Sequence, residues 1–202
     1  MKLTSIVLAG LTTAVAVVSS VAGFAAITPG SKIPFIDLDS GFPPEKVNIA
    51  MHVAGKRAMV VGLPGAFTTT WSSRQIPDYL EYQDAFRAEG IDEIIVFCVN
   101  DGAVMQGWEK AQGTKDTMVT MLADPTGEFT RACGMELTAE GPRRFGLFGR
   151  SKRFAMYVVN NIVQAVVVAE SETDPAGDDY PEPTLAPALL NIARQVNAAH
   201  VH

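Results

Sequence analysis

Three short apolar runs, separated by segments of helical spacing, constrain the fold of this chain more than any other feature. The runs are RAMVVGL (57–63), IDEIIVFCV (91–99) and TMVTMLAD (117–124). Each has the length of a buried strand and ends at a turn signal, such as Pro64-Gly65 after the first run. Strands that alternate with helices predict an α/β fold with a mixed central sheet flanked by helices.

The rest of the pattern completes that architecture. It predicts helices over 72–89, 103–112 and 184–198, a β-hairpin formed by RFAMYVV (153–159) and VQAVVVA (163–169), and a polar loop over 171–183. In such sheets, ligands gather beyond the carboxyl ends of the strands. The segment 64–73, directly after the first strand, is therefore where we expect a functional site.

The N-terminus has the pattern of a secretory signal peptide. Lys2 is followed by an uncharged apolar stretch and then by small residues. We expect a signal over 1–23, cleaved after Ala22 or Gly23. A cleaved signal predicts a secreted protein without stable membrane association.

Two alternatives to secretion are open. About 20 apolar residues can span a bilayer, so 3–25 could form an uncleaved signal anchor. Serine, threonine and glycine dilute this stretch, which favours cleavage. A phenylalanine after the small residues is also compatible with a plastid reached through the secretory route. The folded domain is expected over 31–202 in each case.

Composition excludes several function classes. The formal net charge is −6 and the pI is near 5.0, which argues against a general nucleic-acid binder. The histidines His52, His200 and His202 are scattered, so spacing predicts no metal site, and no cofactor is expected. Two cysteines, Cys98 and Cys133, are too few for a disulfide framework.

Five segments, in the same order and with matching gaps, resemble the type II peroxiredoxins, the atypical two-cysteine or peroxiredoxin five-like group. They are GFPPEKVNI (41–49), VVGLPGAFTTTWSSRQIPDYLE (60–81), VNDGAVMQGW (99–108), LADPTGEF (122–129) and RSKRFAMYV (150–158). The resemblance implies a redoxin domain with a thioredoxin-like fold. It also implies a homodimer, and thioredoxin or glutaredoxin as reductant if the protein is active.

The resemblance points to a site that lacks its reacting atom. The family loop reads Pro-x-x-x-Thr-x-x-Cys; here Pro64 and Thr68 match, and Trp71 occupies the position of the peroxidatic cysteine. The resemblance implies that Pro64 shields the pocket, Thr68 holds the peroxide and Arg153 stabilises the thiolate. Gln75 stands where the family commonly has histidine. An indole has no ionisable group near neutral pH and its N–H only donates, so no covalent step is available to it.

Two main hypotheses about function follow. The first is a catalytically inactive peroxiredoxin homologue that acts by binding or as a dimer partner of an active relative. The alternative is a thioredoxin- or glutaredoxin-dependent peroxidase in which Cys98 or Cys133 reduces hydrogen peroxide and alkyl hydroperoxides. Resolving cysteines of the family would match Val96 or lie in the loop 174–184, which contains none. Both cysteines lie in apolar surroundings that are more typical of buried hydrophobic side chains. A secreted recognition protein that uses the dimer surface is a third interpretation.

Three further features are interpreted as structural. They are Trp108 as a core aromatic, the basic cluster Arg143, Arg144, Arg150 and Lys152 as a solvated loop, and the acidic run 170–182 as a surface loop.

Overall fold

The computed structural model describes residues 26–68, 71–144, 146–171 and 173–199. The signal peptide predicted over 1–23 and the anchor predicted over 3–25 lie outside these residues. Within the described part of the chain, no helix has the length and apolar character needed to cross a membrane.

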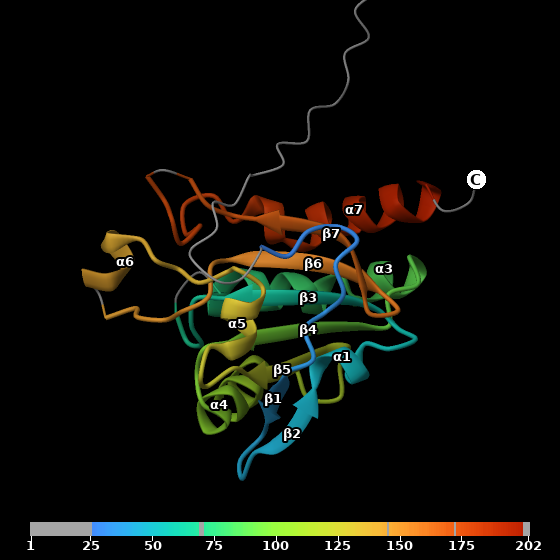
Figure 1. The fold of residues 1–202 in the computed structure, drawn as a ribbon. Helices are drawn as coiled ribbons and strands as arrows, with labels where there is room; N and C mark the ends of the chain where they lie inside the picture. Colours follow the sequence, from blue (N-terminus) through green and yellow to red (C-terminus); the bar gives the residue numbers. More distant parts are fainter. Residues whose placement is uncertain (1–25, 69–70, 145, 172, 200–202) are drawn as a thin grey trace, which may run out of the picture.

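Seven strands of the described chain form one mixed sheet in the order β2-β1-β5-β4-β3-β6-β7 (Figure 1). The strands are β1 (Asp37–Ser40), β2 (Glu45–Asn48), β3 (Arg57–Leu63), β4 (Glu93–Cys98), β5 (Val119–Ala123), β6 (Phe154–Val159) and β7 (Ile162–Val168). The central strands β3, β4 and β5 are parallel, whereas β1, β2, β6 and β7 pair antiparallel with their neighbours. The predicted α/β fold with a mixed sheet is confirmed.

The apolar runs and the hairpin of the sequence appear as strands. Asn160 and Asn161 form the hairpin turn with φ of 47° and 68°, a conformation that asparagine tolerates better than most residues. The strands β1 and β2 were not predicted from the sequence. Both are four residues long and carry charged side chains, so they show little apolar alternation.

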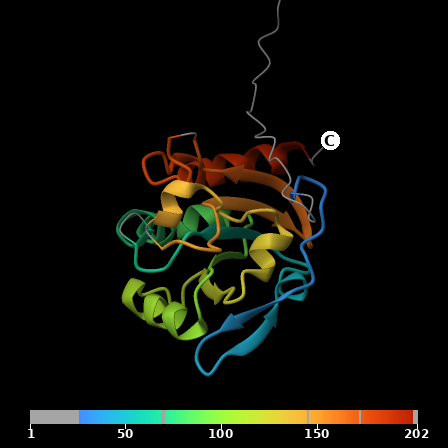
Figure 2. The same ribbon diagram turned by 60° about the vertical axis from the view of Figure 1, so that its left-hand side comes forward.

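Helices cover both faces of the sheet (Figures 1 and 2). They are α1 (Ile49–His52), the π-helical turn η1 (Trp71–Gln75), α2 (Ile76–Glu81), α3 (Gln83–Ala88), α4 (Gly102–Gln112), α5 (Glu128–Ala132), α6 (Glu140–Arg144), the 3₁₀ turn η2 (Glu182–Thr184) and α7 (Ala186–Ala199). Side chains of α2, α3, α4 and α7 form one hydrophobic core with the sheet, and side chains of α1 and α5 form the second core on the opposite face.

The single helix predicted over 72–89 is wrong. The chain instead forms η1, α2 and α3, with a break at Tyr82, where φ is −94° and ψ is 11°. Pro77 lies in the first turn of α2 and has no amide hydrogen to donate to the carbonyl of Ser73. A wider π-helical turn before the proline is a common way to accommodate this missing hydrogen bond.

The central strand β3 alternates strictly between the two cores. Met59 and Val61 face one core and Ala58 and Val60 face the other. At Gly62 the ring of Phe154 crosses the strand so closely that a Cβ atom would lie 2.2 Å from its Cε1. The strand therefore requires glycine at the point where β6 begins beside it.

Candidate functional site

The loop after β3 is tied to the end of the neighbouring strand β4. Pro64 and Gly65 are buried, and the amide of Ala66 donates a hydrogen bond of 3.1 Å to Asn100 Oδ1. Asn100 follows β4, and because β3 and β4 are parallel, their carboxyl ends meet at one edge of the sheet. The first described residues of the predicted site segment, Pro64 to Ala66, do lie at that edge.

Arg150 supports the same region from the other side. Its guanidinium donates to the carbonyl of Val99 at 2.6 Å. A Cβ atom on Gly65 would lie 3.7 Å from the same guanidinium nitrogen. Arg150 lies in a loop, as predicted, but its half-buried side chain is held by Val99 rather than fully solvated.

Thr68 points to its own loop rather than to a distant partner. The residue is exposed, and its hydroxyl donates to the carbonyl of Gly65 at 3.2 Å. Phe67, beside it, has φ of 61° and a ring centroid 6.5 Å from that of the buried Trp108. Trp71 begins the turn η1, and its side chain lies outside what the structure describes.

Arg153 reaches this edge through the register of the sheet. Gly62 near the end of β3 pairs with Phe154 at the start of β6, so the residue before Phe154 lies beside the end of β3. The side chain of Arg153 is fully buried, and a guanidinium nitrogen lies 3.8 Å from Asp178 Oδ1. Burial lowers the pKa of Arg153 to about 10, while the charges of Asp178 and Asp174 and the phenol of Tyr79 act in the opposite direction.

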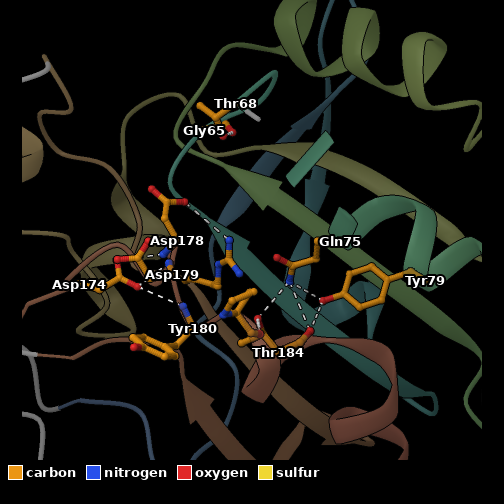
Figure 3. A network of polar contacts seen from close by, with 11 residues as sticks. Gly65, Thr68, Gln75, Tyr79, Asp174, Asp178, Asp179, Tyr180 and Thr184 are labelled. Carbon is orange, nitrogen blue, oxygen red and sulfur yellow. Dashed lines mark hydrogen bonds and ion pairs between the residues drawn. The ribbon is translucent and has the colours of Figure 1, made fainter. Parts of the chain in front are cut away.

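The loop that carries Asp178 is ordered by a second carboxylate. The buried Asp174 accepts hydrogen bonds from the amides of Asp178 (2.9 Å), Asp179 (2.8 Å) and Tyr180 (3.3 Å), as Figure 3 shows. The run 170–182 lies in a surface loop, as predicted, but the loop is ordered by these hydrogen bonds. One of its acids folds the loop, and another is paired with Arg153.

Gln75 belongs to a buried polar cluster between α2 and η2 (Figure 3). Its Nε2 lies 2.7 Å from the Tyr79 hydroxyl and 3.2 Å from Thr184 Oγ1, and the Tyr79 hydroxyl donates to the Thr184 carbonyl at 2.6 Å. Burial raises the pKa of Tyr79, so the phenol stays neutral. The carbonyl oxygen of Gln75 has no hydrogen-bond partner among the described residues. The cluster fixes α2 against the segment that leads into α7.

The structure does not join all the predicted site residues. No hydrogen bond or ion pair between described residues connects Thr68 with Arg153, and Figure 3 shows Thr68 and Gly65 apart from Gln75 and Asp178. Pro64 and Arg153 flank the end of β3. The peroxide-binding roles of these residues stay predictions.

Both thiols of the chain lie inside the protein. Cys98 and Cys133 are fully buried and unpaired, and they belong to the two cores on opposite faces of the sheet. Burial raises the pKa of both thiols, which disfavours the reactive thiolate. Within the described residues, no group of three or more histidine, cysteine, aspartate or glutamate side chains could hold a metal ion.

Comparison with known proteins agrees with this architecture. A model of the redoxin family, described as "Redoxin", matches residues 28–182. A peroxiredoxin of Rhizobium etli is 39% identical over 148 residues, which cover 69% of this chain and 80% of that protein. Peroxiredoxin-2B of Arabidopsis thaliana is 36% identical over 130 residues, which cover 64% of this chain and 76% of that protein.

The chain belongs to the peroxiredoxin family. Among solved structures, reduced Prx3 of Vibrio vulnificus in complex with hydrogen peroxide matches with a TM-score of 0.71 and 31% identity, covering 87% of this chain and 99% of that one. Peroxiredoxin 5 of Alvinella pompejana matches with a TM-score of 0.66 and 30% identity, covering 84% and 99%. The predicted thioredoxin-like peroxiredoxin fold is thereby confirmed.

Several residues around this candidate site were not predicted from the sequence. Asp174 and Gly177 form part of an Asp-Pro-x-Gly segment, a signal for an ordered turn that could have been recognised. Tyr79 and Thr184 carry no comparable signal, because their contact joins residues 105 apart in the chain.

Proposed function

We propose that this protein is a catalytically inactive peroxiredoxin homologue that acts through binding, either as a homodimer or as the dimer partner of an active relative. The observation that carries the proposal is that position 71, aligned by motif with the peroxidatic cysteine, is tryptophan, while both thiols of the chain are buried. A peroxidase of this family needs an accessible thiolate as nucleophile.

The placement of the two cysteines argues against the alternative, a peroxidase that uses Cys98 or Cys133. Cys98 is the last residue of β4, and Cys133 follows the last residue of α5. Neither thiol lies at a helix N-terminus, where backbone N–H groups would stabilise a thiolate. Peroxide would reach either sulfur only after the core had opened.

A binding role is supported by exposed aromatic side chains beside α4. The turn that contains Phe42 packs on the start of α4 so closely that a Cβ atom on Gly102 would lie 2.3 Å from the Gly41 carbonyl oxygen. Phe67 lies against Gly107, farther along the helix: a Cβ atom on Gly107 would lie 3.8 Å from Cζ of the Phe67 ring. Phe42 is 62% exposed and Phe67 is 54% exposed. Exposed aromatic residues of this kind suit a protein interface, and we propose that a second redoxin domain covers them.

We expect the double variant Phe42→Asp/Phe67→Asp to lose its dimeric state. Two carboxylates in an apolar interface should weaken association at least about 100-fold. Aspartate suits position 67 because it tolerates a positive φ. Sedimentation velocity over a concentration series measures the effect. The matched control is Phe35→Asp/Met51→Asp, which changes two exposed apolar residues outside this surface. A double variant that dimerises like the wild type would contradict the proposed interface.

We further propose that the segment 1–23 directs the protein into the secretory pathway. Its single early positive charge, apolar centre and small residues support this route. A protein without peroxidase turnover needs no thioredoxin or glutaredoxin to reduce it, so neither is part of the proposal. The exposed Phe42 and Phe67 support a second redoxin domain as the partner instead.

Peroxide consumption by the purified protein tests the central proposal. With thioredoxin, glutaredoxin or glutathione as reductant, the wild type should remove hydrogen peroxide no faster than protein-free buffer, because no accessible thiolate is present. Turnover that disappears in the Cys98→Ala/Cys133→Ala variant would establish the alternative instead. A native transcript with a cysteine codon at position 71 would also overturn the proposal.

A further inference from the structure

Arg153 is a buried cation, and burial of a guanidinium is costly unless a negative charge lies nearby. Its side chain has no exposed surface, whereas that of Asp178 is 55% exposed. The carboxylate therefore lies between the buried guanidinium and the solvent. Among the charges that act on Arg153, Asp178 has the largest effect in favour of the charged form.

The position of Asp178 is built into the loop rather than left to a flexible side chain. The Asp174 carboxylate binds the backbone amides of Asp178 and the two residues after it. The amide of Asp174 in turn donates to Ser171 Oγ at 3.0 Å. The exposed fraction of Asp174 is 6%, so these charge-assisted hydrogen bonds are largely shielded from water.

The base of the same loop is attached to the backbone of Arg153. The amide of Ala169 donates to the Arg153 carbonyl at 2.9 Å. Gly177, just before Asp178, approaches Ala169 so closely that a Cβ atom would lie 2.0 Å from the Ala169 carbonyl oxygen, and its φ is 71°. The loop leaves the sheet beside Arg153 and returns a carboxylate to the guanidinium of the same residue.

We propose that Asp178 is the chain's own carboxylate ligand for Arg153, held in place by Asp174, so that this side of the site is filled from within and closed to external small anions. The inference rests on the proposed function in one respect: with tryptophan at position 71, no thiolate contributes negative charge there, and Asp178 supplies it. Removal of the Asp178 carboxylate should create a binding place for the smallest carboxylate, formate.

Chemical rescue by formate tests this proposal. Asp178→Ala should lower the Tm by about 2–6 °C. The effect should be smaller than for a fully buried ion pair, because the Asp178 side chain is half-exposed. Sodium formate should then raise the Tm of Asp178→Ala in a saturable manner, because ligand binding to the folded state stabilises it. Formamide, which has the same size and no charge, should have no such effect. Both series are measured at matched ionic strength.

Asp179→Ala is the matched control, since it removes the same charge from the adjacent residue. The wild type and Asp179→Ala should show only the common salt effect of formate. An equal response in all three proteins, or an unchanged Tm of Asp178→Ala, would overturn the proposal.

If Asp178→Ala does not fold, Asp178→Asn provides a second test, because it removes the charge and keeps the shape of the side chain. Its Tm should fall without any saturable response to formate, and a Tm equal to that of the wild type would refute the inference. Failure of the rescue leaves the peroxide assay unaffected, whereas peroxide turnover would overturn the proposed function and leave the rescue result standing.

Discussion

Trp71→Cys should consume hydrogen peroxide at least about 100-fold faster than the wild type, because the variant regains a nucleophile in a site that retains a stabilising cation. Arg153 interacts electrostatically with Arg74 in η1 and Tyr79 in α2. Its positive charge therefore lies near the turn that begins at position 71, and a nearby cation lowers the pKa of a thiol. Peroxide loss in the presence of dithiothreitol, with dimedone labelling of the sulfenic acid, measures the reaction.

Trp71→Ser is the matched control for this experiment. Like Trp71→Cys, it removes the indole, but it places a hydroxyl where that variant has a thiol. The two variants therefore have side chains of nearly the same shape, and only one of them contains sulfur. Equal peroxide consumption by Trp71→Cys and Trp71→Ser would show that the site has lost more than its nucleophile. Dimedone should label position 71 and leave the two buried cysteines unmodified.

Trp108→Ala should reduce the free energy of unfolding by about 3–5 kcal/mol, the usual cost of a large aromatic side chain removed from a core. Trp108 is fully buried and is one of the largest side chains without exposed surface. Its loss also removes the ring beside Phe67 in the loop after β3. Chemical denaturation measures the change, which corresponds to a Tm lower by roughly 10 °C.

Two controls separate packing of Trp108 from general sensitivity of the region. Trp108→Phe retains an aromatic ring and should cost only about 1–2 kcal/mol. Phe67→Ala alters the exposed partner of the same contact and should cost less than Trp108→Ala, because more than half of the Phe67 side chain is already in water. A Trp108→Ala protein as stable as the wild type would contradict the core role that both sequence and structure assign to it.

Much of the fold could be predicted because its signals are local. The runs that became β3, β4 and β5 are short and apolar, and Asn160-Asn161 specifies its own turn. The helix predicted over 72–89 failed because apolar spacing carries no signal for the break at Tyr82, and Pro77 accounts only for the wider turn before α2. The strands β1 and β2 have no comparable local signal, since they are held by pairing with each other and with β5.

Which reactive side chains are available to the site follows from the amino-acid sequence alone. Tryptophan at position 71 supplies no sulfur, and with only Cys98 and Cys133 elsewhere no third thiol exists. Where those atoms lie is a different matter. The burial of the two cysteines on opposite faces, and the pairing of Arg153 with Asp178, depend on strand register and loop geometry. Charges and apolar groups that are distant in the chain meet only when the sheet brings their strands together, so pattern along the chain could not reveal them.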